Sequence, residues 1–287
     1  MSELLLLLQF STPLALAALG ETVTQKSGVI NIGLEGSMLV GAFFGVSATM
    51  ATGSPWFGLA VGVLAGLGLA LISGFFAIAL SADQVVVGTA ATLLATGLTG
   101  TLYRARFGQA GVSLSVERIP SIGGFDLVML IAVLAVPAIW FGLNRTGIGL
   151  ALRAVGEYPK AAEASGFRVN RIRGLALAFG GAMGGLAGAY LALGIVGSFA
   201  ENMVAGRGFV AIAMVTFGRW RPLWVFGACL LIGYLESLQF LFQAKGVRVP
   251  DQLLIGLPYA AALLILVVVG KGTVAPAALA TPYRRRK

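Results

Sequence analysis

The sequence predicts an all-α membrane protein, a polytopic helical bundle of about eight or nine membrane segments with broken or re-entrant helices. Of its 287 residues, 58% are hydrophobic and only 11% are charged, and the mean hydropathy is +0.93. Water-soluble domains are closer to one quarter charged. The 41 glycines are spread through long runs of Leu, Ala and Val. This favours packed helices over a β-barrel, whose strands alternate apolar and polar residues.

Eight apolar segments have the length of about 20 residues that a membrane-spanning helix needs. They cover residues 4–20, 36–52, 56–80, 85–102, 125–143, 174–196, 222–242 and 252–270, and a shorter apolar piece covers 208–218. The leucine-rich start lacks the basic leading region and cleavage site of a signal peptide, so we expect a retained helix. No linker divides these segments, and residues 1–287 are predicted to form one membrane domain.

Glycines recur at four-residue spacing in two of the spans. They are Gly58, Gly62 and Gly66 in one span and Gly180, Gly184 and Gly188 in another, with Gly181 and Gly185 beside the second set. Such faces let helix backbones approach closely. Packing within the chain is favoured over a subunit interface as their role.

One long polar segment, residues 144–173, lies between two spans and sets the expected orientation. Its basic residues are Arg145, Arg153, Lys160, Arg168, Arg171 and Arg173, against Glu157 and Glu163. Because Lys and Arg stay on the cytoplasmic side, this loop is predicted to be cytosolic. Counting spans then puts the N-terminus and the loop 103–125 outside. It also puts the basic tail, residues 271–287, inside, unless the piece 208–218 fails to cross and the tail lies outside.

A short helix is predicted inside that polar segment, between Gly156 and Gly166. Pro159 suits the first helical position, and Gly166 suits the helix end. A helix of this length cannot cross a bilayer. We expect a surface knob that is offered to another protein.

Two polar, glycine-rich breaks interrupt the apolar pattern. The first, residues 21–36, is too polar for a lipid-facing helix, and backbone of this kind is tolerated at membrane depth where it lines a cavity or is buried in protein. Asn31 and Glu35 either cap the following helix or lie near a transport route. The second break, residues 197–208, contains Glu201 and Asn202, which are either caps and loop residues or route residues. Its likeness to the first break hints at an internal duplication.

Further polar residues lie within or beside the spans. Glu236 falls in an apolar span, so we expect it to face the bundle interior, either beside a structural partner or on the route. Asp83 and Gln84 lie between two spans and are predicted to form a turn or a helix cap.

The residue inventory excludes several classes of function. There is no His and only one Cys, Cys229, which excludes disulfides, most zinc sites and His-based catalysis. There is no GxxxxGK[ST] phosphate loop, so any energy source lies in another protein. The net charge of +9 comes from loops and the tail, where basic residues orient helices against anionic lipid instead of binding nucleic acid. No cofactor or metal is expected.

Four segments together resemble a known family. They are residues 27–43, 150–166, 197–209 and 217–222. They resemble the permease subunits of bacterial ABC importers for nucleosides and simple sugars, within the wider ribose and branched-chain amino acid permease family. The resemblance extends from about Leu16 to Tyr283.

The resemblance implies an assembly in the bacterial inner membrane. Two permease subunits, often non-identical, would sit on two ATP-hydrolysing subunits, and an extracytoplasmic binding protein would deliver the nucleoside or sugar. The segment 156–166 resembles the coupling segment that docks on the ATPase, although only part of the docking motif, Glu163-Ala164 and Gly166, is present. The implied coupling residues are Gly156, Glu157, Tyr158, Pro159, Lys160, Ala161, Glu163 and Gly166. The candidate route residues are Asn31, Glu35, Glu201, Asn202 and Glu236.

Alternating access driven by ATP in the partner subunits is the mechanism expected for such a chain. An ion-coupled secondary transporter is the main alternative, with Glu35 and Glu236 as ion carriers. An intramembrane enzyme is a third, which the absence of His and of a pair of membrane Asp residues disfavours.

Overall fold

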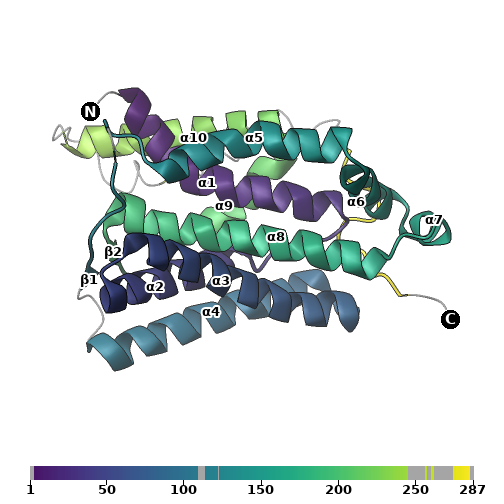
Figure 1. The fold of residues 1–287 in the computed structure, drawn as a ribbon, viewed down its shortest axis with the longest axis horizontal. Coiled ribbons are helices and arrows are strands. Elements are labelled where there is room, and N and C mark those ends of the chain that lie inside the picture. Colours follow the sequence, from purple (N-terminus) through teal and green to yellow (C-terminus); the bar gives the residue numbers. More distant parts are fainter. Residues whose placement is uncertain are drawn as a thin grey trace.

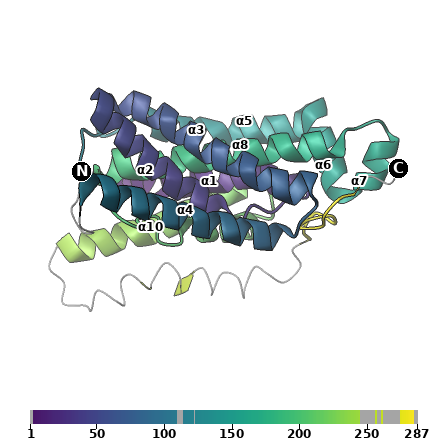
Figure 2. The same cartoon turned by 90° about the horizontal axis from the view of Figure 1, so that it is seen from below.

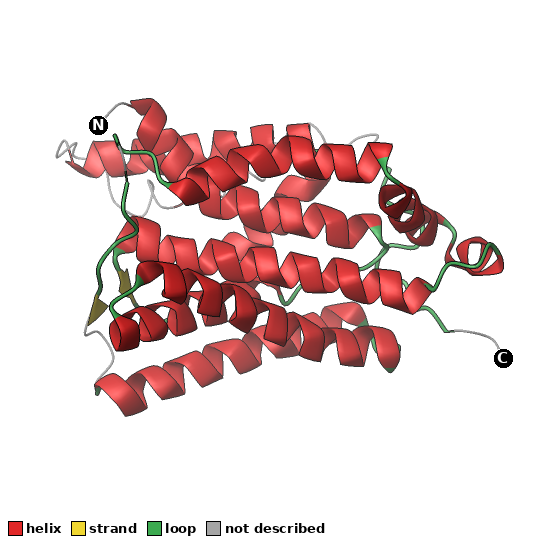
Figure 3. Ribbon diagram, viewed as in Figure 1, coloured by secondary structure: helices red, strands yellow, loops and turns green. Residues whose placement is uncertain are grey.

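The computed structural model describes residues 3–108, 114–121, 123–244, 256, 260–261 and 274–284. Ten α-helices are described, and they make up most of the molecule in Figure 3. They are α1 (Glu3–Lys26), α2 (Leu34–Thr52), α3 (Pro55–Gly74), α4 (Gln84–Phe107), α5 (Leu127–Arg145), α6 (Gly147–Glu157), α7 (Pro159–Ala164), α8 (Val169–Tyr190), α9 (Arg207–Phe217) and α10 (Pro222–Ala244). The predicted all-α bundle is confirmed.

Four short elements complete the described fold. Two π-helical turns, η1 (Phe75–Ala79) and η2 (Leu191–Val196), extend α3 and α8. A small ribbon joins two loops at one end of the bundle, where β1 (Leu114–Ser115) pairs antiparallel with β2 (Ser198–Phe199).

Seven helices of the described chain are long and apolar enough to cross a membrane. They cover residues 4–26, 34–52, 55–79, 84–106, 127–145, 169–196 and 222–239, and they correspond to the first seven predicted spans. The chain is therefore a multi-pass membrane protein. The predicted short piece is α9, whereas the predicted eighth span, residues 252–270, lies almost wholly outside the described residues.

Helix α8 lies at the centre of the packing, against α1, α2 and α3, and Figure 1 shows it running through the middle of the bundle. Its two glycine ridges face different neighbours. A side chain on Gly185 would collide with the backbone of Gly62 and Gly66 in α3, and one on Gly188 would collide with Met38 in α2. The glycine ridges therefore pack within the chain, as predicted.

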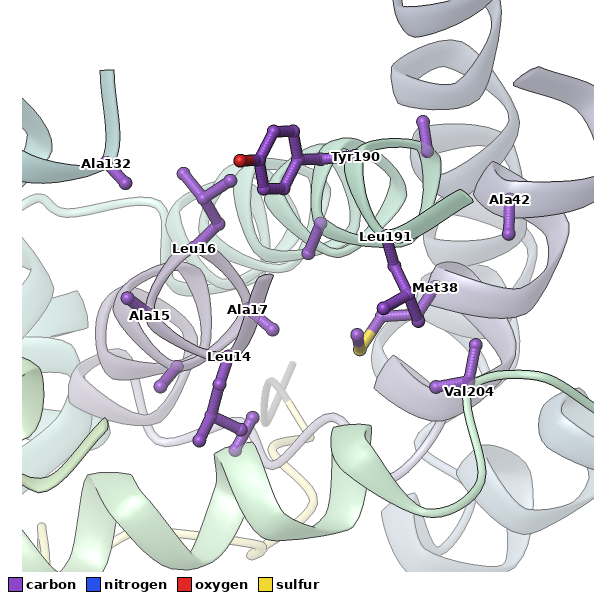
Figure 4. Close-up of a cluster of buried hydrophobic side chains, with 14 of the residues drawn as sticks. Leu14, Ala15, Leu16, Ala17, Met38, Ala42, Ala132, Tyr190, Leu191 and Val204 are labelled. Carbon is purple, nitrogen blue, oxygen red and sulfur yellow. The ribbon is translucent and has the colours of Figure 1, made fainter. Parts of the chain in front are cut away.

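A large apolar core surrounds this contact. Leu14, Leu16, Met38 and Leu191 are almost completely buried in it, and Figure 4 shows side chains from α1, α2 and the end of α8 meeting there. Burial of apolar surface on this scale would stabilise a soluble fold strongly, but lipid is as apolar as leucine. In a bilayer, close van der Waals packing is the stabilising contribution of this core.

Some predicted boundaries are wrong. Helix α1 continues to Lys26, six residues beyond the predicted end, because its polar side chains find partners along the helix: Thr22 Oγ1 donates to the carbonyl of Ala18 (2.7 Å). The first break is therefore confined to residues 27–33. Helix α4 extends to Phe107, α8 begins already at Val169, and the polar segment 144–173 contains an extra helix, α6.

The two ends of the bundle differ. Figure 1 shows the N-terminus at the left, with α6, α7 and the C-terminal residues at the right, and Figure 2 shows the same separation after rotation. Residues 274–284 therefore lie at the end that carries the segment 144–173. This is the arrangement predicted for the case in which the short piece 208–218 crosses the membrane. We call this end, formed by α6, α7 and residues 274–284, the coupling end.

Candidate functional site

The first break, residues 27–33, is a mostly buried, non-helical segment whose backbone is bonded to three different helices. Gln84 Oε1 accepts from the N–H of Ile30 (2.9 Å). Glu21 Oε1 accepts from the N–H of Asn31 (3.0 Å), and Arg173 Nε donates to the carbonyl of Ser27 (3.2 Å). Because buried backbone groups need partners, these side chains fix the course of the break.

A buried polar network lies beside the break. Gln25 Nε2 donates to Glu21 Oε1 (2.9 Å), and Trp220 Nε1 donates to Gln25 Oε1 (2.7 Å). Two atoms of the network, Glu21 Oε2 and Asn31 Nδ2, are buried without a hydrogen-bond partner among the described residues. Such groups are costly in an apolar environment. They are the kind of groups that a polar solute or a water molecule satisfies.

Glu35 joins the two breaks. Its carboxyl oxygens accept from the N–H groups of Gly206 (2.8 Å) and Gly208 (2.7 Å) at the start of α9. Neither Asn31 nor Glu35 is the residue that precedes α2, which is Gly33, and no side-chain cap hydrogen bond forms there, although Glu35 lies in the first turn of α2. Glu35 caps α9 instead, and the structure thereby brings the two predicted breaks together.

Glu201 and Asn202 lie in the second break without joining this contact. Glu201 forms an ion pair with Arg104 of α4, with an N–O distance of 2.7 Å. The side-chain hydrogen bond from Arg104 lowers the pKa of Glu201 below its ordinary value. Asn202 is exposed in a turn with φ of 56°. The loop alternative describes both residues better than the route alternative.

Glu236 in α10 has a partner on another helix, as one of the two alternatives predicted. Its Oε1 lies 3.5 Å from Nε of Arg207, the first residue of α9. Asp83 caps α4 by accepting from the N–H groups of Val85 and Val86, as predicted. The adjacent Gln84 is buried and holds the first break, a role that sequence reasoning missed.

The predicted knob is α7, which begins at Pro159 and is followed by Gly166 with φ of +91°. Figure 1 shows α7 projecting at the right beyond the other helices. Tyr158 is 71% exposed, and Lys160 and Ala161 are also exposed. These residues are accessible to another protein.

Other predicted coupling residues are engaged within the chain. Gly156 packs so closely on α1 that a side chain there would collide with the carbonyl of Lys26. Glu157 Oε2 accepts from the N–H of Ala277 (3.1 Å), and Glu163 accepts a hydrogen bond from the hydroxyl of Tyr283. The C-terminal segment 274–284 is thus bound to Glu157 at the end of α6 and to Glu163 in α7.

Arg173 connects this end to the first break, and sequence reasoning missed it. It is only 2% exposed, although it was counted among the loop cations. Besides Ser27, its guanidinium donates to the carbonyls of Thr281 (2.8 Å) and Ala278 (3.4 Å), and it lies 6.0 Å from the ring of Tyr283. This one cation therefore holds two distant segments, the first break and residues 274–284, against α8.

The chain matches the family model described as branched-chain amino acid transport system, permease component, over residues 4–270. It is 33% identical to a guanosine ABC transporter permease protein, NupQ, of Bacillus subtilis, over 98% of this chain and 95% of that protein. A nucleoside ABC transporter permease protein, NupC, of Lactococcus lactis is 32% identical over 98% and 96%. A putative glucose ABC transporter permease protein, TsgC13, of Haloferax volcanii is 39% identical over 82% and 76%.

Proposed function

We propose that this chain, which belongs to the family of branched-chain amino acid transport system permease components, forms the translocation pathway of an ABC importer for a nucleoside or simple sugar. The relatives named as nucleoside permeases match nearly the whole chain, which supports the solute class. In this proposal the chain lies in the inner membrane and pairs with a second, non-identical permease. An extracytoplasmic protein delivers the solute.

ATP hydrolysis belongs to separate subunits in this proposal, and α7 is the docking element. The observation that carries the assignment is the projecting helix, with exposed Tyr158 and Lys160 at its base. An exposed aromatic ring beside an ammonium group can fill a pocket and pair with acidic groups on a partner. ATP binding would close the ATPase pair, draw the docking helices together and re-pack the permeases around the route.

The docking assignment is tested with Tyr158→Ala combined with Lys160→Ala. Both side chains are exposed, so the fold should survive while the ATPase no longer co-purifies and ATP-driven uptake falls. Glu117→Ala is the matched control, because Glu117 is exposed on the segment of β1, at the opposite end. Undiminished co-purification and uptake in the double variant would contradict the docking role of α7.

Asn31 is proposed to lie beside the solute route. Asn31 Nδ2 and the neighbouring Glu21 Oε2 are both buried without a hydrogen-bond partner among the described residues. Together they could bond a neutral polar solute. Asn31→Leu should lower uptake without abolishing assembly with the ATPase. Thr96→Val is a suitable control, since Thr96 is exposed on α4 and its hydroxyl bonds only its own helix. Normal uptake in the Asn31 variant would exclude the route role.

The ion-coupled alternative would use Glu35 and Glu236 as carriers. Glu35 is held by two N–H groups of the α9 start, and Glu236 lies beside Arg207. These contacts favour structural roles. Uptake that persists when the proton gradient is collapsed, but stops when ATP is removed, would exclude ion coupling.

A further inference from the structure

A cavity at the coupling end gathers five basic side chains from four separate parts of the chain. It has a volume of about 830 Å³. Lys26 comes from the end of α1, Arg145 from the end of α5 and Arg153 from α6. Arg219 and Arg221 come from the turn between α9 and α10. The described residues that line it include no acidic side chain.

None of these cations forms an ion pair with a carboxylate among the residues that the structure describes. The ion pairs found in the described part of the chain are those of Arg104 with Glu201 and of Arg207 with Glu236. The ammonium group of Lys26 is attracted by Glu157, which lies outside the lining, and is repelled by Arg153 and Arg221. A cluster of like charges repels itself, so an anion bound between these side chains would relieve the repulsion.

The turn that carries two of these cations is strained and firmly held. Arg219 and Trp220 have φ of 51° and 53°, a conformation that is costly for residues other than glycine and persists where the surroundings enforce it. Trp220 is 4% exposed, and its indole donates to Gln25. Its burial fixes Arg219 and Arg221 on either side. The segment 217–222 was singled out in the sequence, and the proposed function gives it no role.

The rim of the cavity is apolar and aromatic. Trp140 and Trp224 are 45% and 65% exposed, and Leu223 is 65% exposed. Exposed apolar residues continue along α5 and α10, with Leu134 and Leu231 as examples. Trp side chains concentrate where a membrane meets water. The cavity therefore opens where an apolar, membrane-facing surface meets the polar end of the bundle.

We propose that this cavity binds the phosphate-bearing headgroup of an anionic phospholipid from the surrounding bilayer. The five cations match the phosphate, and the exposed apolar side chains match the acyl chains. An acidic loop of a partner protein would match the cations alone. Basic pockets between membrane helices are known to hold anionic headgroups, and the volume suits one headgroup. The site lies apart from α7 and depends on neither the solute nor the docking role.

The test measures binding of phosphatidylglycerol and phosphatidylcholine to the purified full-length chain in detergent, by native mass spectrometry with lipid titration. Phosphatidylglycerol should be retained preferentially. Arg219→Gln combined with Arg221→Gln should weaken its binding roughly thirtyfold, or about fivefold for each cation removed. The matched control is Arg168→Gln combined with Arg171→Gln, which removes two exposed cations at the coupling end outside this cavity. The control should bind as the unaltered chain does.

Several results would overturn the proposal. Equal retention of both lipids by the unaltered chain would do so, as would equal weakening in the two double variants. If millimolar inorganic phosphate displaced bound phosphatidylglycerol as effectively as added phosphatidylglycerol does, the cavity would be assigned to a free anion. Loss of the co-purifying ATPase with unchanged lipid binding would assign it to a protein partner. Should the double variant fail to fold, Arg145→Gln, at an exposed position, should still weaken binding about fivefold.

Discussion

Replacing Glu35 should separate its structural role from the route role predicted from the sequence. The carboxyl group satisfies two backbone donors, the buried N–H of Gly208 and the half-buried N–H of Gly206. A buried donor without a partner costs about 1–3 kcal/mol and a half-buried donor costs less, so Glu35→Ala should lower the free energy of unfolding by about 2–4 kcal/mol. Glu35→Gln keeps one acceptor oxygen and should cost about half as much.

Equilibrium unfolding in mixed detergent micelles measures this loss, and solute uptake is measured on the same variants. Glu201→Gln is the control, because its exposed pair with Arg104 is screened by water and contributes little. Should both Glu35 variants unfold as the unaltered chain does, Glu35 would not anchor α9. Full stability with lost uptake in Glu35→Gln would instead restore the route role.

Three further outcomes are expected. Gly185→Ala should destabilise the chain by about 1–3 kcal/mol in the same unfolding assay, because the added methyl group forces α8 away from α3. Gly174→Ala on the same helix is the control. It has open space around it and should stay within about 1 kcal/mol of the unaltered chain. Tyr190→Phe removes a buried hydrogen bond to Asp126 (2.6 Å) and should cost about 1–3 kcal/mol by thermal unfolding; an unchanged midpoint would refute this. The pKa of Glu201 is lowered in the folded chain. The stability that its ion pair with Arg104 contributes is therefore fully present above the unfolded pKa of about 4.3, and it is lost as the pH falls through the lower folded pKa. The stability difference between the unaltered chain and Glu201→Gln should therefore vanish in acid, and a difference that grows would contradict this.

The features that follow from local chemistry could be predicted from the sequence. Long apolar runs gave seven of the spans because bilayer thickness sets their length. The short helix α7 followed from Pro159 and Gly166, whose backbone preferences mark a helix start and end. The glycine ridges were predicted correctly because their four-residue spacing puts small residues on one helix face.

Helix ends that depend on burial could not be predicted. Thr22 and Gln25 made the end of α1 look like a break, yet their side chains bond to the helix itself or to its neighbours. Helix α6 was missed because Arg153 and its basic surroundings suggested a solvated loop. Its buried face, which includes Leu152 and Val155, became evident only with the tertiary structure.

The site depends on contacts between residues far apart in the sequence. Glu35 was identified as a candidate, but its partners at Gly206 and Gly208 lie more than 170 positions away. Arg173 was assigned to an exposed loop by its charge, and its burial depends on the carbonyls of the C-terminal segment. Periodicity and composition carry no information on such pairings.

The interlocked glycines of α3 and α8 limit where this protein can bend. Backbone touches backbone at Gly62 and Gly185, and α2 is seated on the same helix at Gly188, so no side chain lies at these points of contact that could change rotamer. They must travel as one rigid slab. A hinge or shear plane that opens a passage therefore has to run along the boundaries of this group, such as the contact between α2 and α4.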